Sequence, residues 1–113
     1  MRGHLPVKER IKLSVPPIAM RLHTNTQGEV LAAADTELVG QTLKDGKITF
    51  HVSKLFYQEK LVSEEEFIEL LSQVGNINLI GERVIRVAAN QKLVPPNEGI
   101  RIAGVPHAQI YKI

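Results

Sequence analysis

The residues best suited to chemistry stand near the end of the chain, in the stretch GVPHAQ that begins at Gly104. A glycine followed by a β-branched residue and a proline predicts a tight bend. Beyond the bend, the pleat of a strand sends His107, Gln109 and Tyr111 to one face of a sheet. Such a face combines stacking surface with hydrogen-bonding groups, which suits single-stranded RNA or a protein partner. The plainer alternative is an edge strand that is polar because polar edges resist aggregation.

A second set of candidate residues is basic and suited to contacts with phosphate groups. Arg83, Arg86 and Asn90 recur at helical spacing and share one stripe of an expected helix, opposite its apolar side. The alternative for this stripe is a solvated face with a Glu82–Arg86 pair, worth about 0.2–0.5 kcal/mol. The residues predicted to bind RNA are, in full, Arg2, Lys8, Arg10, Lys12, Arg21, Arg83, Arg86, Arg101, His107, Gln109 and Tyr111.

The charges are distributed unevenly along the chain, although the net charge is only +2. Residues 1–23 hold five basic residues against one acid, and residues 81–113 hold five against two. Residues 24–80 hold four lysines against nine acids. Basic terminal segments raise the local potential for an anionic partner, so the sequence predicts that both ends contribute to one cationic surface.

The search for catalytic motifs is mostly negative. The sequence has no cysteine and no HExxH, GxSxG, P-loop or GxGxxG motif, and its four histidines lack metal-ligand spacing. We therefore expect no cofactor and no metal, and leave open whether His23, His51 and His107 cluster on neighbouring strands. The alternative function is an enzyme of unknown reaction with a site near Asp35, Glu82 and His107, which requires these side chains to converge.

Length and composition indicate one ordinary globular domain. The 113 residues are 43% hydrophobic, enough for a core without disulfides or metals. The absence of cysteine suits a reducing compartment, no apolar run approaches the ~18 residues that span a membrane, and the N-terminus lacks a secretory apolar segment. We expect a cytoplasmic protein with no membrane contact.

The first half of the chain reads as an extension followed by strands. Residues 1–17 form a basic N-terminal extension that ends in two prolines. A hairpin is expected over residues 18–35 around Gly28, and another strand over residues 47–53, after an Asp-Gly turn. Within that strand the alternation places Ile48, Phe50 and Val52 inward. Residues 54–62 are expected to be a connection whose apolar side chains cover the core, namely Leu55, Phe56, Tyr57 and Leu61.

The second half reads as two helices followed by two strands. Ser63 and Glu66 have the spacing of a capping box, and Gly75 is the expected end of that helix. A second helix is expected from about Asn78 to Lys92, followed by strands over residues 100–103 and 107–113. The sequence thus predicts an α+β domain over residues 18–113. It has a mostly antiparallel sheet of about five strands, with two α-helices inserted between the early strands and the C-terminal strands.

Four motifs resemble those of a known family. They are NLIGER (Asn78–Arg83), IxGVPHAQ (Ile102–Gln109), AAxDxELVG (Ala32–Gly40) and LVSEEE (Leu61–Glu66), together with a DGK turn. They are similar to an archaeal family of small uncharacterised proteins, the domain of unknown function 424, over about residues 18–113. The resemblance implies an archaeal cytoplasmic protein tied to information processing, and residues 1–17 are additional to the family pattern.

The leading hypothesis from the sequence is a small non-catalytic RNA-associated protein, bound to the ribosome and linked to translation. Its partners would be RNA, with ribosomal RNA or ribosomal proteins as the specific candidates. The enzyme described above is the first alternative. The second is a protein–protein interaction module that uses the basic helix stripe and the last strand as a docking edge.

Overall fold

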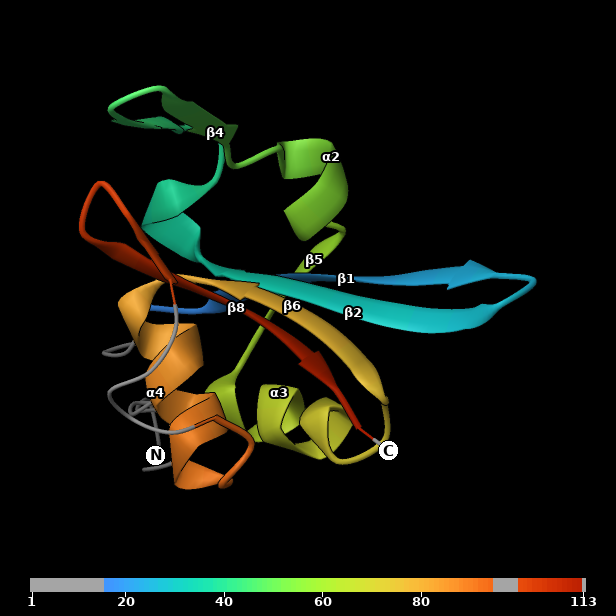
Figure 1. Cartoon of the computed structure of the whole chain (residues 1–113). Coiled ribbons are helices and arrows are strands. Elements are labelled where there is room, and N and C mark those ends of the chain that lie inside the picture. The colour runs from blue at the N-terminus through green and yellow to red at the C-terminus, as the bar shows by residue number, and fades with distance from the viewer. Residues whose placement is uncertain (1–15, 95–99, 113) are drawn as a thin grey trace, which may run out of the picture.

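A six-stranded mixed sheet forms the centre of the protein (Figure 1). The computed structural model describes residues 16–94 and 100–112. Only β2 and β6 run parallel, and the other neighbouring strands are antiparallel. In spatial order the strands are β5 (Lys60–Val62), β1 (Ile18–Asn25), β2 (Gly28–Asp35), β6 (Asn76–Ile80), β8 (Val105–Tyr111) and β7 (Ile100–Ile102).

The β1–β2 hairpin extends beyond the rest of the sheet. Its two strands pair from Ile18–Asp35 to Asn25–Gly28, whereas β2 pairs with β6 only over Leu31–Ala34. The tip of the hairpin therefore projects past β6 (Figure 1). The predicted hairpin over residues 18–35, with Gly28 at a positive φ in its turn, is confirmed.

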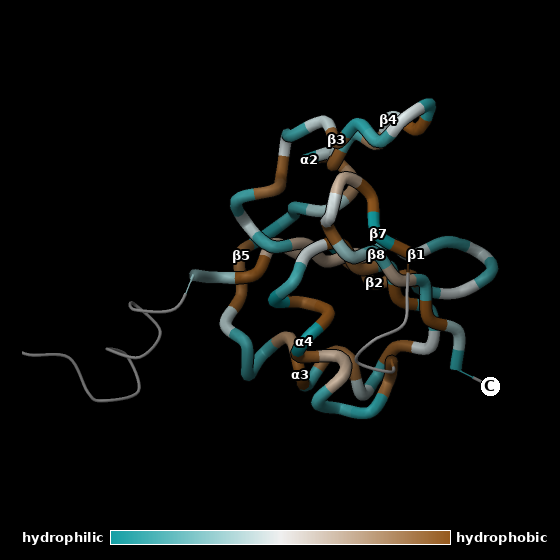
Figure 2. The backbone as a smooth tube through the Cα atoms, turned by 60° about the vertical axis from the view of Figure 1, so that its left-hand side comes forward, coloured by the Kyte–Doolittle hydropathy of each residue, from teal (hydrophilic) through white to brown (hydrophobic). Residues whose placement is uncertain are grey.

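Helices α3 (Glu64–Leu71) and α4 (Glu82–Asn90) cover one face of the sheet, as the side view in Figure 2 shows. The expected Ser63 cap is present, since its hydroxyl accepts a hydrogen bond from the Glu66 amide at 3.2 Å. The main core lies between these helices and the strands. Its largest fully buried side chains are Phe67, Leu71, Leu31, Ile77, Leu79 and Val84.

A second, smaller layer lies on the opposite face of the sheet (Figure 2). It consists of the 3-10 turn η1 (Thr36–Leu38), the two-stranded hairpin β3 (Thr42–Asp45) and β4 (Ile48–His51), and helix α2 (Lys54–Tyr57). A second core of buried residues lies beneath this layer: Ala32, Ala34, Leu43, Val52, Tyr57, Ile80 and Ile102. Both faces of the sheet are thus covered, but the second only in part.

The fold class is confirmed as α+β with a mostly antiparallel sheet, but the number and placement of elements differ from the prediction. In the part of the chain that the structure describes, the sheet has six strands, one pair of which is parallel, and three α-helices accompany it. The largest error concerns residues 78–80, expected as the start of a helix. They belong to the central strand β6, which ends at Ile80; Gly81 follows with φ 125°, and α4 begins only at Glu82.

The segment from residue 47 to residue 62 also differs from its prediction. The strand β4 belongs to a separate hairpin, and Ile48 is exposed rather than inward. The expected connection contains α2 and β5, and of its four apolar side chains only Tyr57 is buried. Helix α3 ends at Leu71, four residues before Gly75, which has no positive φ.

Candidate nucleic-acid interface

Strand β8 places its polar side chains on the sheet face opposite α3 and α4, as the sequence predicted. Ile110 and Ala108 pack into the main core on the helix side. Gln109 and Tyr111 therefore point to the other face, where Tyr111 is 69% exposed. We call the uncovered part of this face, formed by β6 and β8, the open sheet face.

A chain of hydrogen-bonded side chains crosses the open sheet face. The Tyr57 hydroxyl donates to Asn78 Oδ1 at 2.6 Å, and Asn78 Nδ2 donates to Gln109 Oε1 at 2.8 Å. Gln109 Nε2 in turn donates to Asn76 Oδ1 at 2.7 Å. We call these four residues the amide ladder. Burial raises the pKa of Tyr57 to about 12, so its hydroxyl keeps the proton that it donates.

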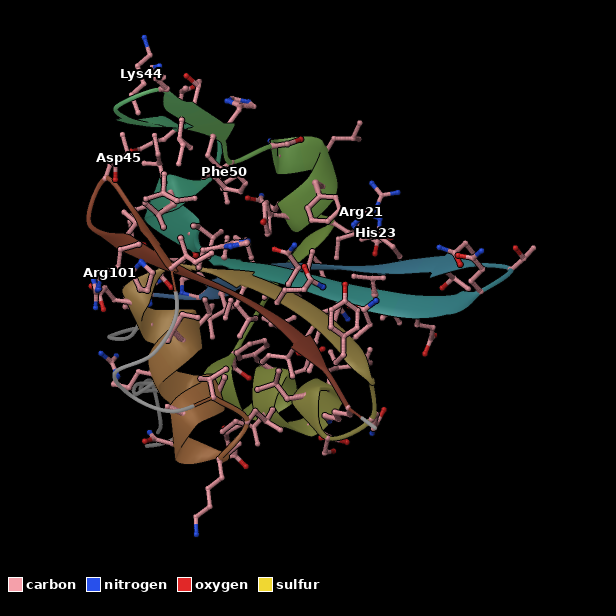
Figure 3. The ribbon with its side chains drawn as sticks, in the orientation of Figure 1. Arg21, His23, Lys44, Asp45, Phe50 and Arg101 are labelled. Carbon is pink, nitrogen blue, oxygen red and sulfur yellow. The ribbon has the colours of Figure 1, made fainter. Side chains whose placement is uncertain are left out.

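Arg21 and His23 lie beside α2 on the same face (Figure 3). The Arg21 guanidinium donates to the Leu55 carbonyl at 2.9 Å, and His23 Nε2 lies 2.8 Å from the Phe56 carbonyl. The two side chains thus satisfy carbonyls at the C-terminal end of α2, which has no following turn to do so. The His23 ring also stacks on Phe56, with ring centroids 4.6 Å apart.

His107 lies further along β8, beneath the β3–β4 hairpin. Its ring is 5.5 Å from that of Phe50, and Nε2 is buried with no hydrogen-bond partner. Burial lowers the pKa of His107, because the imidazolium form is poorly solvated there. His107 therefore borders the second core rather than the open sheet face where Gln109 and Tyr111 lie.

The predicted basic residues of α4 and β7 are largely engaged in ion pairs. Arg83, whose side chain is 16% exposed, donates to the Glu37 carboxylate at 2.6 and 2.8 Å. This hydrogen bond holds the pKa of Glu37 below its usual range. Arg101 donates to Glu82 at 2.9 Å, the carboxylate that the alternative interpretation of the helix stripe had paired with Arg86. Arg86 itself is exposed on α4.

These placements divide the predicted site into separate regions. Helix α4, which carries the exposed Arg86, covers one face of the sheet (Figure 1). Gln109 and Tyr111 alternate with Ile110, which packs on that side, so they lie on the other face. The single cationic surface that the sequence predicted from α4 and the last strand is therefore wrong. The predicted contacts of the N-terminal extension, Arg2, Lys8, Arg10 and Lys12, lie outside the described residues.

Asp35 acts as a helix cap contributed from a distant strand. It stands at the end of β2, is 4% exposed, and accepts hydrogen bonds from the Arg83 and Val84 amides, both at 3.0 Å. A carboxylate suits the N-terminus of α4 because the helix dipole is positive there. A Cβ at Gly81 would lie 2.6 Å from Asp35 Oδ1, so the glycine leaves room for the cap.

This cap bears directly on the enzyme alternative. Both oxygens of Asp35 are occupied by backbone amides, and Glu82 is paired with Arg101. The residues proposed with His107 as a site thus have separate structural partners.

A family profile described as "Protein of unknown function (DUF424)" matches residues 22–113. The chain belongs to this family. Among solved structures, this DUF424 protein is similar to one described as an uncharacterized conserved protein from Methanopyrus kandleri. The two are 28% identical with a TM-score of 0.72, over 84% of this chain and 90% of the other. No curated protein matches the sequence.

The histidines of this DUF424 protein have different neighbours. His23 stacks on Phe56, His51 Nδ1 lies 2.9 Å from the Thr42 hydroxyl, and His107 lies against Phe50. In residues 16–94 and 100–112, no group of three or more His, Cys, Asp or Glu side chains is placed to hold a metal ion. None of the helices in the described part of the chain is long and apolar enough to cross a membrane.

Three members of the amide ladder in this DUF424 protein were not predicted from the sequence as site residues: Tyr57, Asn76 and Asn78. The two asparagines alternate with Ile77 and Leu79, a period-two pattern that is typical of a strand with one polar face. That pattern was the available signal for both β6 and its polar face. Tyr57 carried no comparable signal, because its contact with β6 depends on where α2 packs.

Proposed function

We propose that this protein is a non-catalytic RNA-binding protein that holds single-stranded RNA on its open sheet face. The observation that carries the proposal is the exposed Tyr111 beside the amide ladder. An exposed aromatic ring offers a stacking platform to an unpaired base, and neighbouring amides offer hydrogen bonds to the edge of that base. Sheet faces of this kind stack two or three bases in known RNA-binding modules.

Arg21 lies beyond the open sheet face, on the far side of a covered strand. Arg21, Ala32, Asn78 and Gln109 are register partners across four neighbouring strands, and Ala32 between them is buried in the second core. At about 4.8 Å between strands, Arg21 on β1 is roughly 14 Å from Gln109 on β8. Arg21 stands at one end as a phosphate contact, and Tyr111 at the other side as the stacking residue. Both were predicted to bind RNA from the sequence, together with Gln109.

Charge makes a modest contribution in the folded body. The described residues hold ten basic and ten acidic side chains, so the excess positive charge belongs to the remaining segments. Arg83 and Arg101 are paired with carboxylates, which leaves Arg21 and Arg86 as the predicted arginines without an acidic partner in the described residues. We therefore expect the body to bind RNA chiefly through stacking and hydrogen bonds, and the basic N-terminal extension to add phosphate contacts.

The direct test measures binding of single-stranded RNA by fluorescence anisotropy at several salt concentrations. Tyr111→Ala should weaken binding by about 5- to 150-fold, the effect of losing about 1–3 kcal/mol of stacking on one base. Tyr111→Phe keeps the ring and should bind nearly as the parent does. Arg86→Ala lies on the opposite face and is the matched control. An absence of RNA binding at low salt, or an unchanged affinity in Tyr111→Ala, would overturn the proposal.

The N-terminal extension is tested by removing residues 1–15, which spares Pro17. The Pro17 carbonyl accepts hydrogen bonds from Thr36 and Arg83 and belongs to the folded body. Four basic residues are removed, so the log–log slope of affinity against salt should fall by up to about 3. An unchanged slope would exclude the extension as a phosphate contact. Salt-sensitive co-migration with a ribosomal subunit would identify ribosomal RNA as the partner.

A second candidate is docking of a protein along the free part of β8. Strand β7 pairs only with Val105–His107, so no described strand covers the outer edge of Ala108–Tyr111. An extended peptide could add there as another strand. Pull-downs before and after nuclease treatment separate the two candidates, because only RNA-mediated partners are lost after nuclease.

A further inference from the structure

We propose that the amide ladder selects RNA bases that carry an exocyclic carbonyl group, such as uracil, over bases that carry an amino group there, such as cytosine. The inference rests on the proposed RNA-binding function and assigns a specificity role to Asn76, Asn78 and Gln109. Its basis is the direction of the hydrogen bonds in the ladder, which leaves both N–H donors of the terminal Asn76 without a partner in the ladder.

Tyr57 fixes that direction. Its hydroxyl is buried, and Asn78 Oδ1 is the acceptor of its proton at 2.6 Å. Turning over one amide alone would bring two oxygens or two NH₂ groups together. Turning over all three would leave the Tyr57 proton without its acceptor, which is unfavourable for a buried donor.

The end of the ladder at Asn76 is left as a donor. Each side-chain oxygen of the ladder accepts one hydrogen bond from within it and keeps a second lone pair. Each NH₂ group has two hydrogens. Asn78 and Gln109 use one apiece, whereas Asn76 uses neither within the ladder. Two of the four remaining hydrogens thus lie together on the Asn76 nitrogen, which favours a base edge that places an acceptor there.

The donors lie beside the proposed stacking residue. Asn76 and Tyr111 are register partners on β6 and β8, and Gln109 precedes Tyr111 by two residues on the same face. Cross-strand partners have Cβ atoms about 5 Å apart, so a base stacked on Tyr111 has its edge within reach of these amides. Uracil presents a carbonyl oxygen where cytosine presents an amino group, in rings of equal size. An amide N–H placed at that position donates a hydrogen bond to the carbonyl oxygen of uracil. It has no acceptor in the amino group of cytosine, which is itself a donor.

The test compares oligouridine and oligocytidine of about ten nucleotides, within the range that one such surface contacts. The parent protein should bind oligouridine about 5- to 150-fold more tightly, which corresponds to about 1–3 kcal/mol for one well-formed base contact. Asn76→Asp preserves the acceptor for Gln109 and replaces the two outward hydrogens by a second acceptor. It should therefore reduce or reverse the preference for uridine.

Gln27→Glu is the matched control, because it makes the same amide-to-carboxylate change at the exposed tip of the β1–β2 hairpin. It should weaken both oligonucleotides equally and leave their ratio unchanged. Equal binding of the two oligonucleotides by the parent, or an unchanged ratio in Asn76→Asp, would overturn the selectivity while RNA binding stands. A parent protein that binds neither would overturn both proposals. Thermal unfolding of each variant confirms that it is folded.

Discussion

Replacement of Asp35 should destabilise the fold strongly, because this carboxylate caps α4 from the end of β2. Asp35→Ala removes two hydrogen bonds of 3.0 Å and leaves the Arg83 and Val84 amides without an acceptor in a buried site. Loss of a helix cap costs about 0.5–2 kcal/mol, and a partly buried charge at a helix end contributes up to about 2 kcal/mol more. We therefore expect a loss of about 3 kcal/mol, and a smaller loss for Asp35→Asn, which keeps one acceptor.

Urea denaturation measures this loss. With a slope of about 1.5 kcal/mol per molar urea, 3 kcal/mol lowers the midpoint by about 2 M. Asp45→Ala is the matched control: Asp45 is exposed and accepts one bond, from the Ala103 amide at 2.9 Å, so its loss should cost about 0.5–1 kcal/mol. A midpoint for Asp35→Ala equal to that of the parent would refute the capping role. RNA binding per folded molecule should be unchanged, since Asp35 lies away from the open sheet face.

Three further predictions concern neighbouring features. Gly81→Ala should lower the free energy of unfolding by about 1–3 kcal/mol because of its φ of +125°, and by more because the new Cβ clashes with Asp35. The loss should be smaller when Asp35 is already replaced by alanine, which a double-mutant cycle in urea measures. Arg83→Ala should raise the pKa of Glu37 toward 4.5, which NMR titration measures. The stability that this pair contributes is present above pH 4.5 and is lost as the pH falls through the lower pKa of Glu37 in the folded state. His107 has a pKa below 6.5 in the folded state, so the stability of the protein should decrease as the pH falls from 6.5 through the pKa of the folded state. His107→Gln should remove this pH dependence of stability, which urea midpoints measured above and below pH 6.5 report.

Local signals in the sequence were sufficient for the elements that depend on near neighbours. The β1–β2 hairpin follows from alternation around Gly28, and the start of α3 from the spacing of Ser63 and Glu66. The faces of β8 also followed from alternation, with Gln109 opposite to Ile110. Each of these features is determined within one continuous stretch of chain, the longest being the hairpin over residues 18–35.

The central strand β6 was misread because its stability comes from distant partners. Asn78 resembled the polar residue that often begins a helix, and the apolar residues after it were counted into that helix. In the fold, Asn78 instead lies between Ala32 of β2 and Gln109 of β8. Sequence periodicity cannot specify which strands become neighbours, so the position of β6 had no local signal.

The candidate site was predictable only in the part that lies on one strand. Gln109 and Tyr111 were found, whereas the amide ladder joins α2, β6 and β8 and required the strand order. The capping role of Asp35 also depends on distant elements, and without them the residue was considered as part of a catalytic site. Its partner amides lie 48 and 49 residues further along the chain.

The parallel pairing of β2 with β6 has a consequence for the order of folding. Leu31 and Ile77 are register partners, and the intervening chain passes through the β3–β4 layer, around the β5 edge and through α3 before it returns. Closing a segment of this length costs about 3 kcal/mol of chain entropy before any contact compensates for it. The β1–β2 hairpin should therefore form early and β6 should dock late, in a slow step. Since Asp35 reaches α4 only after that docking, the last helix should gain its full protection from hydrogen exchange in the same event.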